Sequence, residues 1–175
     1  LSAKGMLAKV RSVFEKVPEP ARDPRGIKSE ISLPDCLMSG LAIFGLKFPS
    51  LLQFDEGRED EIIKHNLKTL YQVEDAPCDT SIRERLDEVD PHSIRPAFTA
   101  IFFLLQRGKV LEDYRFLGKY LLIACDGTGM FSSESVHCEN CCEKHHKDGR
   151  VTYYHQMLGA VVVHPDQQEV FPLCP

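Results

Sequence analysis

The chain has 175 residues, of which 43% are hydrophobic, and carries a formal net charge of -5 at pH 7. That length and composition allow a buried core, in one domain or in two small ones. No apolar run reaches the roughly 18 residues of a membrane helix, and the first residues lack the apolar block of a signal peptide. We therefore expect a cytoplasmic protein with no membrane partner.

The charge is distributed unevenly along the chain. Residues 1–30 are rich in Lys and Arg, whereas residues 55–90 are rich in Asp and Glu. An acidic balance is unusual for a nucleic-acid-binding domain. A chain with a net negative charge can still carry a local basic surface.

The first residues predict an amphipathic helix. Leu7, Val10, Phe14 and Val17 recur at helical spacing over residues 4–17. The prolines and the glycine of "VPEPARDPRG" then break the helix. We assign residues 1–30 to a basic helix followed by a proline-rich linker.

Residues 31–117 predict a helical domain. Ser32 with Pro34 opens the apolar helix "PDCLMSGLAIFGL", and "EDEIIKHNLKTLY" has a second apolar stripe. "CDTSIRERLDEVDP" contains a capping box, Ser81-x-x-Glu84. Ser93 opens a last helix that Gly108 ends. This domain is a candidate for DNA binding or dimerisation.

After residue 118 the pattern changes to strands. "KYLLIACD" is a continuous apolar run, which is typical of a strand buried on both faces. "VTYYHQMLGAVVVHP" and "EVFPL" predict two further strands joined by a hairpin turn. The predicted class is α+β, with helices first and antiparallel strands after them. Three strands without a covering helix are an unfinished layer, so we expect residues 118–175 to begin a longer domain.

Asp126 follows the apolar run and has two interpretations. Asp-Gly is a strong signal for a tight hairpin turn. However, the next predicted strand begins only near residue 151, and "GTG" leaves the backbone beside the carboxylate bare. A carboxylate held by a strand suits Mg²⁺ or Mn²⁺ in phosphoryl transfer, although that chemistry needs further acids.

The segment "YLLIACDGTGMFSSESVHCENCCEKHHKDGRVTYYHQMLGAVVVHPDQQEVFPL", with "DTSIRERLDEVDP" upstream, resembles the first part of the catalytic core of bacterial insertion-sequence transposases of the DDE class. The resemblance covers about residues 30 to 175. It implies the first three strands of a mixed, RNase H-like sheet with a Cys/His loop insertion. Asp126 matches the first acid of the Asp-Asp-Glu triad, which binds Mg²⁺ or Mn²⁺.

The resemblance also implies a function. The intact protein would be a homo-oligomer that cuts and transfers double-stranded DNA at the ends of the insertion sequence. The second Asp and the Glu would lie beyond Pro175, so we expect the chain alone to be inactive.

"HCENCCEKHH" indicates a separate metal site. Clustered thiols and imidazoles in a reducing compartment favour Zn²⁺ over a disulfide. A structural zinc site needs four nitrogen or sulfur ligands. We predict Cys138, Cys141, His146 and His155, with Cys142 and His137 as substitutes. A Cys-rich polar loop and a redox pair are the other interpretations.

Basic residues of the helical region are candidates for DNA contacts. Those of the capped helix and of the first helix are Arg83, Arg85, Lys9 and Arg11. Pairing with neighbouring acids is the competing explanation for each arginine. Two alternative functions stay open: a non-catalytic zinc-stapled module that binds DNA or protein, and a zinc hydrolase.

Overall fold

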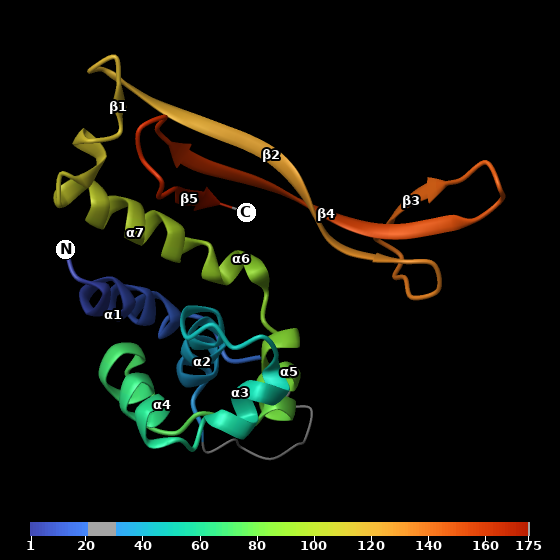
Figure 1. Ribbon diagram of the computed structural model, residues 1–175. Helices are drawn as coiled ribbons and strands as arrows, with labels where there is room; N and C mark the ends of the chain where they lie inside the picture. The colour runs from blue at the N-terminus through green and yellow to red at the C-terminus, as the bar shows by residue number, and fades with distance from the viewer. Residues whose placement is uncertain (21–30, 175) are drawn as a thin grey trace. The chain divides into compact units, whose positions relative to one another are not determined.

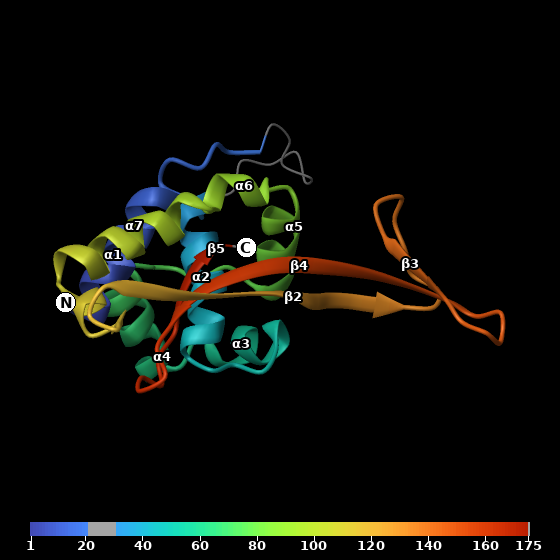
Figure 2. The same ribbon diagram turned by 90° about the horizontal axis from the view of Figure 1, so that it is seen from above.

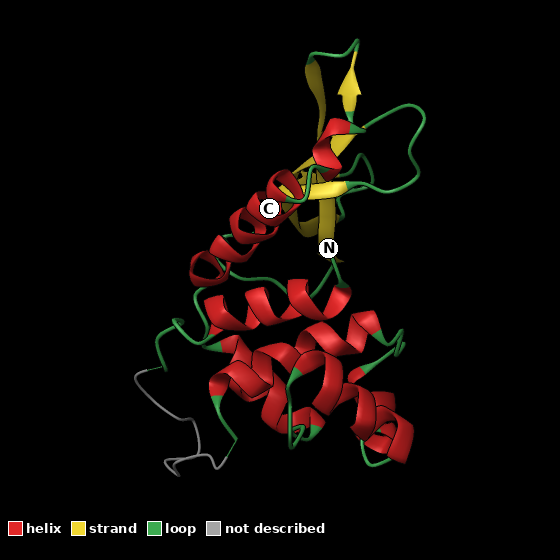
Figure 3. Ribbon diagram, turned by 90° about the vertical axis from the view of Figure 1, so that its left-hand side faces the viewer, coloured by secondary structure: helices red, strands yellow, loops and turns green. Residues whose placement is uncertain are grey.

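The chain folds into two compact units, Leu1–Gly108 and Lys109–Pro175, in a computed structural model that describes residues 1–20 and 31–174 (Figure 1). The first unit is helical and the second is built around an antiparallel sheet (Figure 3). The α+β class predicted from the sequence is therefore confirmed. The second unit begins before residue 118, and most of the predicted linker, residues 21–30, lies outside the described residues.

Polar side chains cap most helices of the first unit. Ser2, Ser32, Ser50, Asp60 and Asp90 each accept a hydrogen bond from a backbone N–H of the helix that follows, which satisfies donors that have no partner within the helix. The elements described are α1 (Ala3–Phe14), α2 (Leu33–Gly45), α3 (Leu51–Gly57), α4 (Glu61–Asn66), the π-helix η1 (Leu67–Tyr71), α5 (Asp79–Asp87), α6 (Pro91–Ile94) and α7 (Pro96–Arg107).

Two helix starts differ from the prediction. Ser81 lies inside α5, whose N-cap residue is Cys78, so the predicted capping box does not open this helix. The helix predicted from Ser93 is divided into α6 and α7, because Asp90 caps a first turn that begins at Pro91, and Pro96 starts the next helix. Proline is favoured at both first positions since it needs no N–H partner there.

The core of the first unit forms where α1 and α2 meet α3, η1 and α5. Val10, Phe14 and Val17 are buried, as the helical spacing predicts. Buried residues occur on most sides of α2, in keeping with its apolar sequence. Phe54 and Met38 are completely buried and Ile82 nearly so. No helix among the described residues is long and apolar enough to cross a membrane.

The second unit is built on one long antiparallel pair, β2 (Tyr120–Ser133) with β4 (Val151–Val163). The 3₁₀ helix η2 (Val110–Glu112) and β1 (Arg115–Phe116) precede this pair. β1 joins the start of β2, β5 (Phe171–Cys174) joins the last part of β4, and β3 (Cys142–His145) joins the first part of β4. β3 therefore lies at the opposite end of the ribbon from β1 and β5 (Figure 2).

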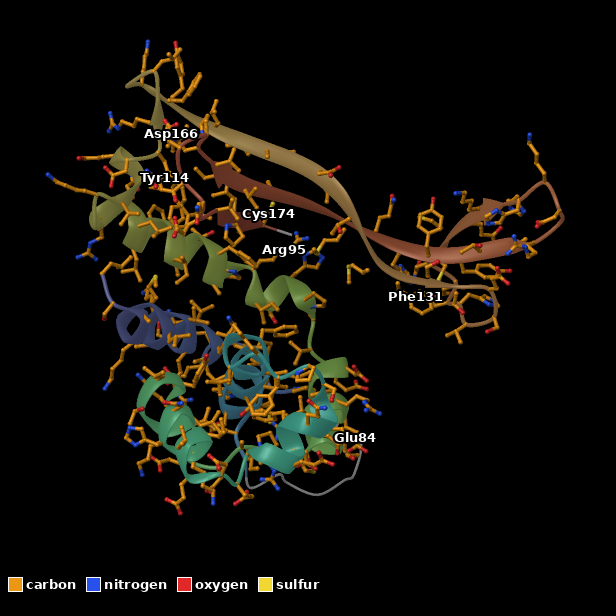
Figure 4. The ribbon with its side chains drawn as sticks, in the orientation of Figure 1. Glu84, Arg95, Tyr114, Phe131, Asp166 and Cys174 are labelled. Atoms are coloured by element: carbon orange, nitrogen blue, oxygen red, sulfur yellow. The ribbon has the colours of Figure 1, made fainter. Side chains whose placement is uncertain are left out.

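A small apolar cluster lies at the β1 and β5 end of the ribbon. Tyr114 is buried, its ring lies 4.7 Å from that of Phe171, and its hydroxyl donates a 3.1 Å hydrogen bond to the carbonyl of Glu169. Val162 on β4 is also almost fully buried. Figure 4 shows Tyr114 at this end and Phe131 toward the β3 end.

The prediction that the apolar run before Asp126 is buried on both faces is wrong in this structure. Most of β2 is exposed, and the side chain of Ile123 is 55% accessible. The physical reason is the absence of a second layer over this strand within residues 109–174. Among the described residues, β1 is the only strand beside β2 on the side away from β4, and it reaches no further than Leu121.

The contact between Gly45 and Tyr71 gives a stability prediction. A Cβ atom at Gly45 would overlap the Tyr71 hydroxyl, far inside van der Waals distance, and Tyr71 is buried. We expect Gly45→Ala to lower the free energy of unfolding by about 1–3 kcal/mol, the usual range for overpacking. Urea unfolding followed by circular dichroism measures this change.

A comparison of Gly45→Ala in two backgrounds tests whether the overlap with Tyr71 causes the loss of stability. In a Tyr71→Phe background the overlapping oxygen is gone, so Gly45→Ala is expected to cost much less there. An equal cost in both backgrounds would contradict the steric explanation.

Candidate metal centre

Three of the predicted zinc ligands meet at the β3 end of the ribbon. The Sγ atoms of Cys138 and Cys141 are 3.8 Å apart, and each lies close to Nε2 of His155, at 3.4 and 3.3 Å. These three residues are the one group of three or more potential metal ligands found within the described parts of the chain. The group could bind a metal ion such as zinc.

The spacing of the three atoms fits a zinc tetrahedron. Zn–S bonds of about 2.3 Å and Zn–N bonds of about 2.0–2.1 Å place two sulfurs about 3.8 Å apart and a sulfur and a nitrogen about 3.6 Å apart. The separations in the structure agree with both values within a few tenths of an ångström. A disulfide needs about 2.05 Å between the sulfurs, and both cysteines are free thiols.

The strand register explains why His155 meets the cysteines. Cys142, the first residue of β3, pairs with Tyr154, so the preceding residue, Cys141, falls opposite His155. On the other side of β4, Phe131 pairs with His155, and the two rings lie 6.1 Å apart. Residues opposite each other in an antiparallel pair point to the same face. His155 is therefore held between an aromatic ring on β2 and a thiol at the start of β3.

The loop between β2 and β3 brings Cys138 back to this face. The hydroxyl of Ser133 accepts hydrogen bonds from the N–H groups of Ser135 and Val136 where β2 ends. A turn then joins the two cysteines, in which the N–H of Cys141 donates to the carbonyl of Cys138 at 3.2 Å. The N–H of Cys138 donates in turn to the Cys141 sulfur at 3.3 Å, so the two cysteines hold each other in one tight turn.

His146, the fourth predicted ligand, is not part of the group. Its Nε2 atom lies 2.8 Å from the hydroxyl of Thr152. Thr152 and His155 are three residues apart on β4 and point to opposite faces of the strand. Cys142 is on the wrong face for the same reason, since it pairs with Tyr154. Spacing along the loop could not indicate these faces, because they depend on the register of β3 against β4.

The turn between β3 and β4 is closed by its own contacts. The N–H of His146 donates to the carbonyl of Arg150, and Gly149 has a positive φ of 86°, which glycine adopts without strain. The Arg150 guanidinium bonds Asp148 at 2.8 Å and Glu134 at 2.9 Å. The hydrogen bonds from Arg150 lower the pKa of the Asp148 carboxyl.

Asp126 lies within β2, not at its end. It pairs with Gly159, its side chain is exposed, and its carboxylate accepts a 2.8 Å hydrogen bond from the N–H of Gly127. Gly159 and His155 share a face of β4 but are four residues apart, or about 13 Å along a strand. The carboxylate and the Cys/His group are thus two separate sites.

Two of the four candidate DNA-contacting residues have structural partners. Arg11 forms a 2.8 Å ion pair with Asp35 on α2. Arg85 donates to the Ile31 carbonyl at 2.7 Å and pairs with Glu19. Both side chains are largely shielded from solvent, and they connect helices to neighbouring segments. Arg83 and Lys9 are exposed.

One feature of this site was not predicted from the sequence. The ring of His137 stacks on that of Tyr153, with centroids 4.2 Å apart and an angle of 18° between the planes. The odd-numbered aromatic and histidine positions of "VTYYH" could have indicated a shared face.

No family model, curated protein or solved structure matches this chain.

Zinc protection of the thiols tests this site. We expect Zn²⁺ to slow alkylation of Cys138 and Cys141 by iodoacetamide, because a metal-bound sulfur is a poor nucleophile, and to leave the exposed Cys142 and Cys125 reactive. Cys36 serves as an internal control, since burial raises its pKa to about 11 and keeps it unreactive with or without zinc. Peptide mass spectrometry reads each site. Equal protection of Cys142 and Cys138 would contradict the assignment.

Proposed function

We propose that the chain is part of a DDE-class DNA transposase, in which residues 109–175 begin the RNase H-like catalytic sheet. One observation carries this proposal: Asp126 lies on the first long strand of an antiparallel series, β2–β4–β5, with an exposed carboxylate. This is the position that the resemblance assigns to the first catalytic acid. The substrate class that follows is double-stranded DNA.

The surroundings of Asp126 support an approach by a bulky ligand. A Cβ atom added at Gly127 or Gly129 would meet nothing within 4 Å, and one added at Gly159 would meet only the Asp126 carbonyl. The backbone around the carboxylate is therefore open on both strands. A DNA backbone needs such an approach if a carboxylate-bound cation is to reach a phosphate.

Asp126 by itself does not complete a Mg²⁺ or Mn²⁺ centre. Its oxygens are suitable ligands for these cations, but no group of three potential ligands within the described residues includes it. In the proposed protein the other acids come from sequence beyond residue 175, and the chain alone is inactive. The exposed side chains of Arg83 and Lys9 remain candidates for phosphate contacts.

The second candidate is a non-catalytic module stapled by zinc, which binds DNA or another protein. The distances among Cys138, Cys141 and His155 favour it, because a structural metal would hold the long hairpin between β2 and β4. The two candidates differ in the role of Asp126, which is irrelevant to binding in the second.

Substitution of Asp126 in the intact protein distinguishes these candidates. A marked copy of the DNA segment that carries the gene supplies both the protein and its DNA ends, and its transfer to a conjugative plasmid is counted. We expect Asp126→Asn and Asp126→Glu to reduce transfer to background, because the first removes a charged oxygen ligand and the second displaces it by one methylene.

Asp166→Asn is the matched control. Asp166 lies in the turn between β4 and β5, with an 87% exposed side chain, and its substitution is expected to leave transfer unchanged. Normal transfer by both Asp126 variants would sink the transposase proposal. Protein levels measured by immunoblotting exclude loss of the protein as the cause.

A further inference from the structure

The geometry points to His137 as the fourth ligand of the metal held by Cys138, Cys141 and His155. This inference concerns the Cys/His group and does not rest on the proposed transposase function. It determines the kind of site, because three protein ligands leave an open position for a reactive water, whereas four close the site and make it structural.

The stacking contact of His137 defines the face on which its ring lies. Its ring stacks on Tyr153, which is two residues from His155 on β4. Residues two apart on a strand point to the same face and are about 7 Å apart. The imidazole of His137 is therefore on the metal side of the hairpin, although its nitrogens are not part of the group that Cys138, Cys141 and His155 form in this structure.

The irregular backbone at Cys138 allows two adjacent side chains to share this face. Adjacent residues of a regular strand point to opposite faces, which would separate His137 from Cys138. Residues 136–138 are not part of a strand, however. In this irregular segment His137 reaches Tyr153 while Cys138 reaches His155, so both side chains are already on one face.

The other spare thiol and imidazole donors of this hairpin lie away from the Cys/His group. Cys142 and His146 are on the far face, with Tyr154 and Thr152. His145 pairs with Val151, four residues or about 13 Å along the strand from His155.

Of these spare thiol and imidazole groups, His137 is the one that lies on the correct face and stacks on a residue only about 7 Å along the strand from His155. It would exchange its stack on Tyr153 for a bond to the metal. The stack is exposed to solvent on the His137 side, so its loss is a small cost compared with a metal–nitrogen bond.

Titration of the purified chain with Co²⁺, followed by displacement with Zn²⁺, tests the assignment. Co²⁺ reports coordination number and thiolate ligation in its visible spectrum. We expect the parent chain and His146→Ala to give the same spectrum of a four-coordinate centre. We expect His137→Ala to weaken Zn²⁺ binding by about 10- to 100-fold or more, because loss of a residue that only orients a metal ligand already weakens binding by that factor.

A second variant separates ligation from stacking. His137→Phe keeps an aromatic ring on Tyr153 but has no nitrogen donor, so it is expected to bind Zn²⁺ as weakly as His137→Ala. Binding retained by His137→Phe would assign His137 to stacking alone and overturn the inference, as would an affinity loss in His146→Ala instead. A parent chain that binds neither ion would overturn the whole site, and the transfer assay on Asp126 would be unaffected by that result.

Discussion

The antiparallel pairing of β2 with β4 is the frame on which the candidate functional side chains of the second unit lie, because it positions Asp126 and His155 directly and β3 pairs with the same β4. The register places Asp126 opposite Gly159 and Phe131 opposite His155, with an irregularity between Gly129 and Phe131. Because side chains alternate between faces, a shift of one residue would move the whole set to the other side. The extra residue at this bulge is what brings Phe131 opposite His155.

The sequence predicted the helical unit well, because periodic apolar residues and caps act locally. Val10, Phe14 and Val17 are buried as their spacing requires, and Ser32 caps α2. The strand unit was harder to predict. "CEKH" forms β3 although it is polar and only four residues long, so its pattern gave no signal. The prediction of His146 as a ligand rested on its nearness to the cysteines along the loop. That nearness does not indicate which face of the strand a side chain lies on, because the face follows from long-range strand pairing.

The solvent exposure of β2 was not predicted from the sequence, for a different reason. A continuous apolar run indicates that something covers a strand on both sides, but the covering layer is a property of the surrounding chain. Residues 109–174 contain no such layer, and Ile123 and Leu158 are exposed. Asp126 is consequently a solvated carboxylate here, open on its glycine-rich side.

The two candidate sites suit different metals. The sulfur and nitrogen donors at the end of the hairpin match a borderline-soft ion, and the carboxylate matches a hard one. About 13 Å of strand separates them, so neither ion would have to share a ligand with the other.

In the first unit, Arg11 and Arg85 each hold two segments together through Asp35, Glu19 and the Ile31 carbonyl, which makes them poor candidates for a partner's phosphates.

The edge of β2 that faces away from β4 is largely unpaired, which matters for the charge of Asp126. Beyond Leu121, no strand among the described residues borders β2 on that side, and an unprotected strand edge invites pairing with another molecule. Charged side chains are a common defence against such pairing. Asp126 is the only charged residue between Tyr120 and Ser133. Asp126 is therefore the one side chain of this strand whose charge opposes such pairing.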